Sequence, residues 1–398
     1  MTIKKTISLG KLCSGVAMVF GTTVGAGMLG IPSLMAGVNF GSAFYVTALV
    51  WIFMAITGLL LLEVTLKMPS GANLISLSGR FLGRKGKWIA GVLFLFLYYC
   101  LLVAYFSGGA PLLGEVFSLM GISLLPSFAK LLFLCLFGGV ILLGARFISF
   151  VNLILAIGMF ISYGILITLG SANIQMEALS SWEFSFAAAA IPILFSAFGF
   201  HNIIPSLTGY LNKEKKTLQL SIVGGTFLAF IFYLAWLGLV LGSVPVAALE
   251  EARALGVPVT YALQAASGGA SLYVWGQVFA FFALTTSFLG VSFSFVDFIQ
   301  DGFAESKRNV NRAICCLCTL IPPFICVMIN PSLFEKALGV AGGFGESILN
   351  GLLPVALFVK MRQSLEKPTS YSLKALLIFL VVFSLFVILV EGYDLLVH

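Results

Sequence analysis

Two apolar segments of this 398-residue chain are each interrupted by residues that do not readily continue a helix. The first interruption is a run of glycines and threonines that ends at a proline (residues 21–32), and the second also reaches a proline (residues 195–205). Glycine destabilises a helix interior, and proline removes a helical hydrogen bond. Because unpaired backbone groups are costly in lipid, such breaks persist only inside protein or beside a cavity. Matching breaks in two halves of a chain are typical of the substrate site of a secondary transporter.

The broken ends would offer backbone groups that suit a zwitterionic ligand. A half-helix presents free N–H groups and partial positive charge at its N-terminus, and free carbonyls and partial negative charge at its C-terminus. We expect a carboxylate to bind the amides of Gly25, Ala26 and Gly27, because their small side chains allow close approach. An ammonium group would bind carbonyls close to the two breaks, at Thr22, Thr23, Phe195 and Ser196. The alternative role of such glycines is close helix packing, which we prefer for Gly30, Gly37 and Gly41.

Ionisable residues inside predicted membrane segments are a second set of candidates, because they are expensive in lipid and are by default functional hypotheses. Four qualify: Glu63, His201, Asp297 and Glu346. His201 directly follows the second break, and imidazole titrates close to neutral pH, which suits a proton switch. Its alternative role is to satisfy backbone groups that the break leaves free. Glu346 lies in a glycine-rich stretch (residues 342–346) and is a candidate proton carrier or gate.

Glu63 and Asp297 lie near the ends of their segments that are predicted to face the cytoplasm. At these positions they could pair with basic residues such as Lys67 or Lys307, and we favour this role over proton coupling.

The elements that position these residues are predicted to be membrane helices. The chain is 60% hydrophobic and only 9% charged, whereas soluble domains carry about 25% charged residues. Since a span needs about 20 apolar residues to cross about 30 Å of hydrocarbon, we predict eleven segments. Their ranges are 11–36, 41–66, 88–115, 128–145, 147–170, 186–211, 217–242, 271–300, 311–330, 334–359 and 373–395.

The basic residues predict the orientation of these segments. If the N-terminus is cytoplasmic, all but three of the 22 Lys and Arg residues fall inside, the exceptions being Lys130, Arg253 and Lys336. An excess of Lys and Arg in cytoplasmic loops sets orientation, so the net charge of +7 reflects topology, and no nucleic-acid partner is expected. The basic segment before Lys11 is expected to lead into an uncleaved first span rather than a signal peptide. An odd number of spans places the C-terminus on the outer side of the membrane.

Breaks in the first and sixth segments divide the chain into five plus five segments and an extra eleventh one. Because five is odd, the second set begins on the opposite side of the membrane, which makes an inverted repeat. We predict a first repeat at residues 1–170, a second at 171–360 and an additional helix at 361–398. Exterior loops at 171–185 and 243–270 could form short amphipathic helices.

Several stretches resemble the hydroxy and aromatic amino acid permeases, most closely the tyrosine-specific permeases of bacteria. They are residues 21–29 (GTTVGAGML), residues 196–201 (SAFGFH) with Pro205-Ser206, residues 285–291 (TTSFLGV) with Asp297-Phe298, and residues 61–64 (LLEV). The resemblance covers nearly the whole chain in order and length. It implies an all-α polytopic membrane protein with the LeuT-like fold, in the inner membrane of a bacterium, so that the outer side, where the C-terminus is expected, is the periplasm. It also implies proton-coupled import of an aromatic amino acid, tyrosine before tryptophan or phenylalanine, without a cofactor.

The resemblance also directs attention to further residues near the breaks. Phe198 and Phe200 flank Gly199 in the second break, Asn202 follows it, and the third segment adjoins the first break. The third segment carries Tyr98, Tyr99 and Tyr105 as candidate aromatic contacts, with Tyr99 foremost. Hydroxyls at a position where sodium-coupled members of the fold bind a cation are supplied by Thr285, Thr286 and Ser287. Interhelical hydrogen bonding is the alternative for these three, and the resemblance favours protons.

Two other classes of function are less well supported by the sequence. A carrier of the same fold could use sodium, or could take a hydroxy amino acid such as serine or threonine. A membrane enzyme is not supported, because the chain has no H-E-x-x-H motif. Its seven cysteines, including Cys315, Cys316 and Cys318, lack metal-ligand spacing and are expected to pack as small apolar residues.

Overall fold

The computed structural model describes residues 8–69, 72–119, 121–180, 187–266, 269–305, 311–366, 368 and 370–397. These residues form helices joined by turns and contain no β-strand. Nine of the described helices are long and apolar enough to cross a membrane, and α1 with its continuation makes a tenth as a bent pair. α5 is apolar but has only 17 residues. Each of the eleven predicted segments overlaps one of these helices or broken helices, and the protein is a multi-pass membrane protein.

The first half of the described chain contains nine helical elements. They are α1 (Leu9–Thr23), η1 (Ala26–Gly30), α2 (Ile31–Leu34), α3 (Phe40–Thr65), α4 (Leu74–Leu119), α5 (Pro126–Leu142), α6 (Ala145–Ser171), α7 (Met176–Ser180) and α8 (Ala190–Ala197). The second half begins with η2 (His201–Ile203), α9 (Ile204–Tyr210), α10 (Lys215–Ser243), α11 (Val246–Leu255), η3 (Val259–Ala265) and α12 (Gly269–Glu305). It ends with α13 (Arg312–Ile329), α14 (Phe334–Val340), η4 (Ala341–Leu352), α15 (Leu353–Ser364) and α16 (Tyr371–Val397).

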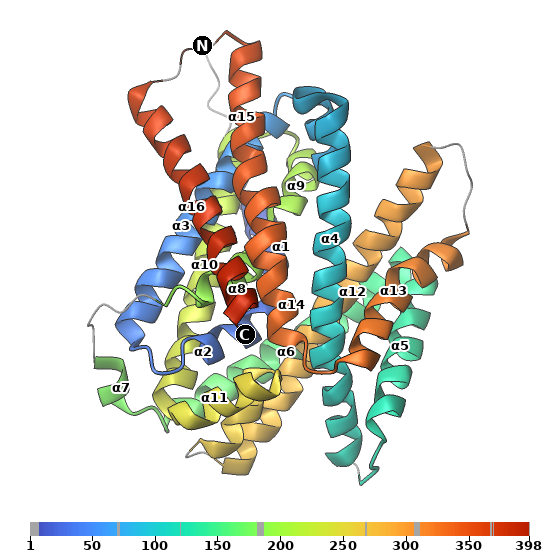
Figure 1. Cartoon of the computed structure of the whole chain (residues 1–398), viewed down its shortest axis with the longest axis vertical. Helices are drawn as coiled ribbons and strands as arrows, with labels where there is room; N and C mark the ends of the chain where they lie inside the picture. The colour runs from blue at the N-terminus through green and yellow to red at the C-terminus, as the bar shows by residue number, and fades with distance from the viewer. Residues whose placement is uncertain are drawn as a thin grey trace.

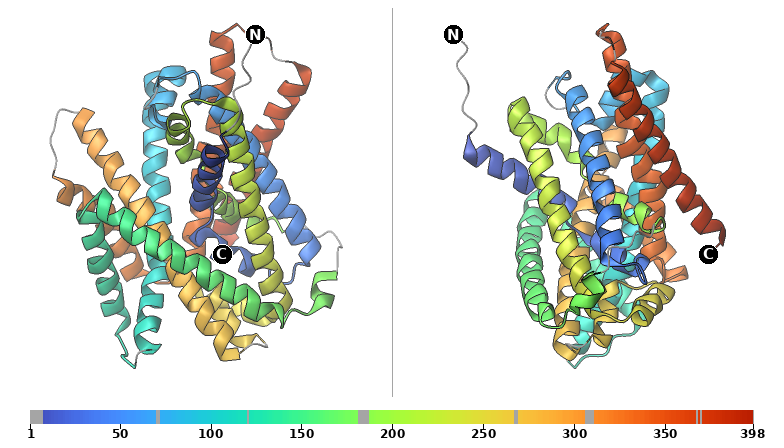
Figure 2. Two further views of the ribbon diagram at one scale, coloured as in Figure 1. Left: turned by 180° about the vertical axis from the view of Figure 1, so that it is seen from behind. Right: turned by 90° about the vertical axis from the view of Figure 1, so that its left-hand side faces the viewer.

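Most of the long helices run broadly along the longest axis of the molecule (Figure 1), whereas α6 crosses it obliquely (Figure 2). α1 begins in the half of this axis at whose end α15 finishes, and α7 and α11 lie towards the other end, as the views from behind and from the side also show (Figure 2). We call the end nearer to the start of α1 the N-terminal face and the end at which α11 lies the opposite face. Along the chain, the first broken span runs from α1 to α2, away from the N-terminal face, whereas the second runs from α8 to α9, towards it, so the two broken spans are antiparallel (Figure 1).

Both predicted breaks are present. α1 ends at Thr23, where Val24 and Gly25 adopt extended backbone, and the segments on either side of this break are bent by 43°. α8 ends at Ala197, and three residues separate it from η2. A Cβ atom on Gly27 would lie only 2.8 Å from the Cα of Ala197. Glycine at this position therefore allows the two breaks to pack directly against each other.

A third irregular span was not predicted. α14, η4 and α15 form one continuous stretch, Phe334–Ser364, whose middle part is a π-helix. π-helical turns are rare and frequently occur at functional sites. Glycines let this stretch approach its neighbours closely: Gly342 lies against the backbone of Pro192, and Gly351 lies against Ser384.

Two connecting regions complete the comparison with the predicted organisation. The residues between the second and third predicted segments (67–87) are helical from Leu74 onward, and Gly83 with φ +74° allows the sharp turn into the span of α4. The helices expected in the two exterior loops are present as α7, α11 and η3. Glu183 of the first loop lies outside the described residues.

Candidate functional site

A cavity of about 450 Å³ lies where the two breaks meet. Residues 21–27 form one side of it, and α4, α6, α12 and η4 supply the rest of the wall. Five lining residues are exposed: Gly21, Phe160, Asn202, Ser206 and Gly290. Gly21 precedes the first break, and Asn202 and Ser206 follow the second, which places these three on the N-terminal side of the breaks. The cavity is therefore open towards the N-terminal face. Its volume falls in the range of roughly 300–1,000 Å³ that small-molecule sites occupy.

The wall towards the opposite face is sealed by close packing between the broken spans. Ser196 Oγ donates a hydrogen bond of 2.8 Å to the carbonyl of Leu338. Gly30 is also closely packed, because a Cβ there would lie 3.3 Å from Ile193 Cδ1 and 3.4 Å from Leu338 Cδ1. Together with the contact between Gly27 and Ala197, these interactions close the cavity on that side.

Two side chains of α10 satisfy backbone carbonyls that the breaks leave free. The hydroxyl of Tyr233 lies 2.7 Å from the carbonyl oxygen of Thr23 and 2.8 Å from that of Ala197, the last residues of α1 and α8. Trp236 Nε1 donates to the carbonyl of Met28 at 3.1 Å. The last carbonyls of a helix have no partner within the helix, so Tyr233 and Trp236 of α10 provide hydrogen-bond donors that the broken spans lack.

The predicted carboxylate site is modified by a side chain from α12. Gly25, Ala26 and Gly27 all line the cavity. The amide of Ala26, however, donates to Ser287 Oγ at 3.0 Å, and a Cβ on Gly25 would lie 2.6 Å from the same oxygen. A carboxylate at this amide must therefore displace the Ser287 hydroxyl or bind beside it.

The predicted site residues divide into those that line the cavity and those that lie behind its wall. Lining residues are Thr22, Thr23, Gly25, Ala26, Gly27, Ser196, Gly199, Asn202, Thr286, Ser287 and Glu346. Residues outside the lining are Glu63, Tyr99, Phe195, Phe198, Phe200, His201, Thr285 and Asp297.

The aromatic wall of the cavity consists of Phe94, Tyr98 and Tyr105 on α4 and Phe160 on α6. Tyr99 points elsewhere, because its hydroxyl donates to the carbonyl of Cys318 at 2.8 Å. Phe94 and Phe160 were missed in the sequence. Positions 94, 98 and 105 follow helical spacing from one face of α4, and this periodicity was the available signal.

The three phenylalanines expected at the second break pack behind it. The ring centroid of Phe195 lies 5.0 Å from that of Phe53, and Phe198 meets Tyr233 edge-on at 5.0 Å. Phe200 lies against the ring of His201. All three are fully buried, so they fix the shape of the break instead of contacting a ligand in this conformation.

Of the four ionisable candidates, Glu346 is the one that lines the cavity. Its carboxylate lies beside Gly199, where a Cβ would be only 2.8 Å from Oε1. Asn350, one turn further along η4, donates a hydrogen bond to Oε2. Glycine at position 199 therefore brings the second break into contact with this carboxylate. His201, by contrast, is 0% exposed and lies outside the lining.

His201 occupies a closed polar position between α3 and η2. Its Nε2 lies 2.9 Å from Thr57 Oγ1, and its Nδ1 is buried without a hydrogen-bond partner among the described residues. This arrangement matches neither of the predicted roles fully, because the imidazole reaches neither the cavity nor a backbone group freed by the break.

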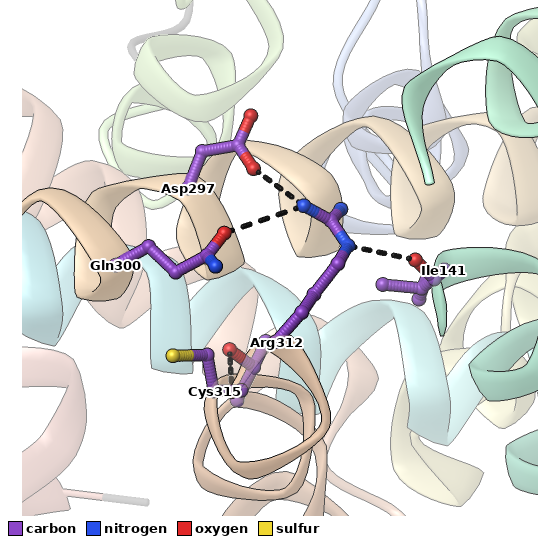
Figure 3. Close-up of polar contacts among 6 residues, drawn as sticks. Ile141, Asp297, Gln300, Arg312 and Cys315 are labelled. Atoms are coloured by element: carbon purple, nitrogen blue, oxygen red, sulfur yellow. Dashed lines mark hydrogen bonds and ion pairs between the residues drawn. The ribbon is translucent and has the colours of Figure 1, made fainter. Parts of the chain in front are cut away.

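Glu63 and Asp297 are both engaged in ion pairs with basic residues, although not with the expected ones. Glu63 pairs with Lys215 at the start of α10. Arg312 Nη1 donates to Asp297 Oδ1 at 3.1 Å and to Gln300 Oε1 at 3.4 Å (Figure 3). Lys307, one of the anticipated partners, lies outside the described residues.

The hydroxyls considered for a cation are held in different ways. Thr286 Oγ1 donates to the carbonyl of Phe282 at 2.9 Å, and Ser287 Oγ accepts from Ala26. Thr285 Oγ1 is buried without a hydrogen-bond partner among the described residues. The described part of the chain contains no group of three or more His, Cys, Asp or Glu residues that could hold a metal ion.

Comparisons with known proteins agree on one family and one fold. The model of the tryptophan/tyrosine permease family matches residues 9–391. "Tyrosine-specific transport system 1" of Haemophilus influenzae is 31% identical over 365 residues, covering 89% of this chain and 90% of that protein. "Tryptophan-specific transport protein" of Pseudomonas aeruginosa is 30% identical over 342 residues, covering 83% and 82%. The crystal structure of MhsT in complex with L-phenylalanine aligns with a TM-score of 0.59 at 14% identity, covering 97% of this chain and 98% of MhsT. The predicted LeuT-like fold is confirmed.

Proposed function

The chain belongs to the tryptophan/tyrosine permease family, and on this premise we propose that it imports aromatic amino acids together with protons. Tyrosine is the first substrate to test, with tryptophan and phenylalanine next, because relatives are named for tyrosine and tryptophan and MhsT was crystallised with phenylalanine. The membrane is the inner membrane of a bacterium, with the N-terminus in the cytoplasm. The curated relatives are permeases, not enzymes.

The observation that carries this proposal is the aromatic cavity at the junction of the two breaks. The amino acid carboxylate would bind near the amides of Gly25 and Gly27, and the ammonium would bind carbonyls of the broken ends. The side chain would then lie among Tyr98, Tyr105 and the phenylalanines of α4 and α6. A well-oriented aromatic pair contributes about 0.5–1.5 kcal/mol beyond area burial, which favours an aromatic over an aliphatic substrate.

Glu346 is the best-placed proton carrier in this scheme. Among the described lining residues it is the charged one, and it contacts both the second break at Gly199 and the π-helix on which it lies. A carboxyl in contact with the break can respond to substrate, because binding there changes its electrostatic surroundings. His201 remains the alternative, through its contact with Thr57.

Alternating access would follow from the seal between the broken spans. With the N-terminus in the cytoplasm, the cavity is open to the cytoplasm, and the contacts of Gly27 with Ala197 and of Ser196 with Leu338 close it to the outside. Outward opening requires these contacts to separate while a second barrier forms on the cytoplasmic side.

A sodium-coupled carrier is the second candidate, supported by one feature. The buried hydroxyl of Thr285 lacks a hydrogen-bond partner in the described structure. Thr285 directly precedes Thr286 and Ser287 on α12. A cation bound beside Thr285 would be coordinated by this oxygen.

Uptake into liposomes reconstituted with the purified protein tests the proposal. Labelled tyrosine should accumulate when the exterior is acidic, a protonophore should abolish accumulation, and sodium at constant pH should change little. Excess phenylalanine or tryptophan should compete, and serine should not. Accumulation that requires sodium and ignores pH would favour the second candidate, and strong competition by serine would refute the aromatic assignment.

A further inference from the structure

A second polar cavity lies on the other side of the seal. It has a volume of about 490 Å³ and is bounded by α11, α14 and the end of α16, near the opposite face. Ile193 lines this cavity and also packs against Gly30 in the seal. The two cavities are therefore separated by the packed broken spans, and in the proposed orientation the second cavity faces the outside.

Glu391 of α16 reaches this cavity from inside the protein. Its side chain is only 4% exposed, yet it belongs to the cavity lining. No hydrogen bond or ion pair joins Glu391 to another residue in the described part of the chain. Leaving an isolated carboxylate in such a place is costly, and binding a proton removes that cost.

Glycines on the neighbouring span make room for this carboxyl group. A Cβ atom on Gly339 would lie 2.9 Å from both Oε1 and Oε2 of Glu391. One turn further along, Gly343 leaves space for the Cβ and Cγ of the same side chain. The carboxyl is thus seated in a groove of α14 and η4, and the groove would close if either glycine carried a side chain.

The other charged groups of the cavity are already engaged or lie at its edge. Arg253 forms an ion pair with Asp394 at 3.7 Å, and Glu335 accepts a hydrogen bond from Ser33. Titratable and charged groups face Glu391 from four elements: Cys100 on α4, Glu250 and Arg253 on α11, Glu335 and Lys336 on α14, and Asp394 on α16. Arg253 is directed to Asp394, which leaves Glu391 as the buried carboxyl of this cavity with neither an ion pair nor a hydrogen bond to another described residue.

From these features we infer that Glu391 is the group that takes up the transported proton from the outside. The inference rests on the proposed proton coupling. Glu391 packs against Gly339 and Gly343. Three residues after Gly343, the same span carries Glu346, which lines the central cavity. Protonation of Glu391 removes a negative charge from the groove of α14 and η4, and it thereby biases the position of the span that bears the central carboxyl. α16, which corresponds to the additional helix after the two predicted repeats, then takes part in proton coupling.

The test compares accumulation with exchange in reconstituted liposomes. Glu391→Gln keeps the size of the side chain but cannot bind and release a proton. Glu250→Gln is the matched control, since Glu250 lines the same cavity but is exposed. Two quantities are measured for each protein: tyrosine accumulation under an acidic exterior, and counterflow, in which labelled and unlabelled tyrosine exchange at equal pH on both sides.

For one proton per substrate, a gradient of one pH unit supports accumulation of up to about tenfold at zero membrane potential. We expect Glu391→Gln to fall to no accumulation while its counterflow stays at the level of the unmodified protein. Glu250→Gln should be unchanged in both assays. A pH-sensitive dye inside the vesicles should report tyrosine-dependent acidification for the control and none for Glu391→Gln.

The inference is overturned if Glu391→Gln accumulates tyrosine normally, or if it loses counterflow together with accumulation, because the latter identifies a structural group. Failure of the proposed function itself has a different signature, since the unmodified protein would then show no pH-driven accumulation.

Discussion

Replacement of Tyr233 by phenylalanine should weaken substrate binding although this residue does not line the cavity. Its hydroxyl reaches the last carbonyls of both α1 and α8, at 2.7 and 2.8 Å. Phenylalanine keeps the ring and its edge contact with Phe198. The substitution therefore removes the hydroxyl that joins the two breaks and leaves the packing of the ring in place.

The size of the effect follows from the surroundings of the hydroxyl. Tyr233 is 0% exposed, and Thr23 and Ala197 are 4% and 2% exposed, so water cannot easily replace the lost donor. An unsatisfied buried acceptor costs about 1–3 kcal/mol, whereas hydrogen bonds between membrane helices average about 0.6 kcal/mol and reach about 1.7. A loss of about 1–2 kcal/mol in the binding-competent geometry corresponds to a Kd for tyrosine that rises about 5–30-fold.

Tyr163→Phe provides a matched control. The hydroxyl of Tyr163 on α6 donates to the carbonyl of Phe232 on α10 at 2.8 Å, next to Tyr233 in the chain but without a bond to the end of α1 or α8. Calorimetric binding of tyrosine and thermal unfolding in detergent should be measured for both variants. We expect both to lose some thermal stability and only Tyr233→Phe to lose affinity. Equal losses of affinity, or none in Tyr233→Phe, would refute the idea that this hydroxyl sets the geometry of the site.

Three further predictions concern the cavity and the ionisable candidates. Gly27→Ala places a Cβ 2.8 Å from backbone and should cost about 1–3 kcal/mol of stability with loss of binding, whereas Gly21→Ala enters open space and should keep binding, as a thermal-shift and binding series will show. Glu346→Gln should abolish pH-driven accumulation and retain counterflow, while His201→Gln should keep both. The reverse pattern would identify His201 as the proton carrier. Asp297→Asn removes a partly exposed ion pair, so it should change the free energy of unfolding by at most about 1 kcal/mol and leave accumulation intact, and a coupling defect would contradict this.

Features encoded by local sequence were predicted well. The membrane segments follow from hydropathy, and both breaks follow from glycine and proline, because these residues act on the backbone at their own positions. Gly27 was expected to let a carboxylate approach the backbone, which stays a prediction; the close neighbour that the structure shows there is Ala197. Substrate and coupling came from family resemblance, since backbone breaks alone do not distinguish one amino acid from another.

Features that depend on helix rotation and on distant partners were not predicted. Tyr98 and Tyr99 are adjacent in sequence but point about 100° apart around a helix, so only one faces the cavity. The π-helix at residues 341–352 turns Glu346 into the cavity, and no propensity rule predicts such a turn. Glu391 was overlooked because it lies close to the end of its segment, where a carboxylate is usually solvated; its burial depends on the glycines of α14 and η4.

The claim that the junction of the two breaks is the substrate site is tested most directly by an experimental structure with bound tyrosine. We expect density for the amino acid between residues 25–27 and Gly199, with the ring among Tyr98, Tyr105 and Phe160. Density in the second cavity beside Glu335 and Glu391, with the junction of the breaks unoccupied, would contradict the account.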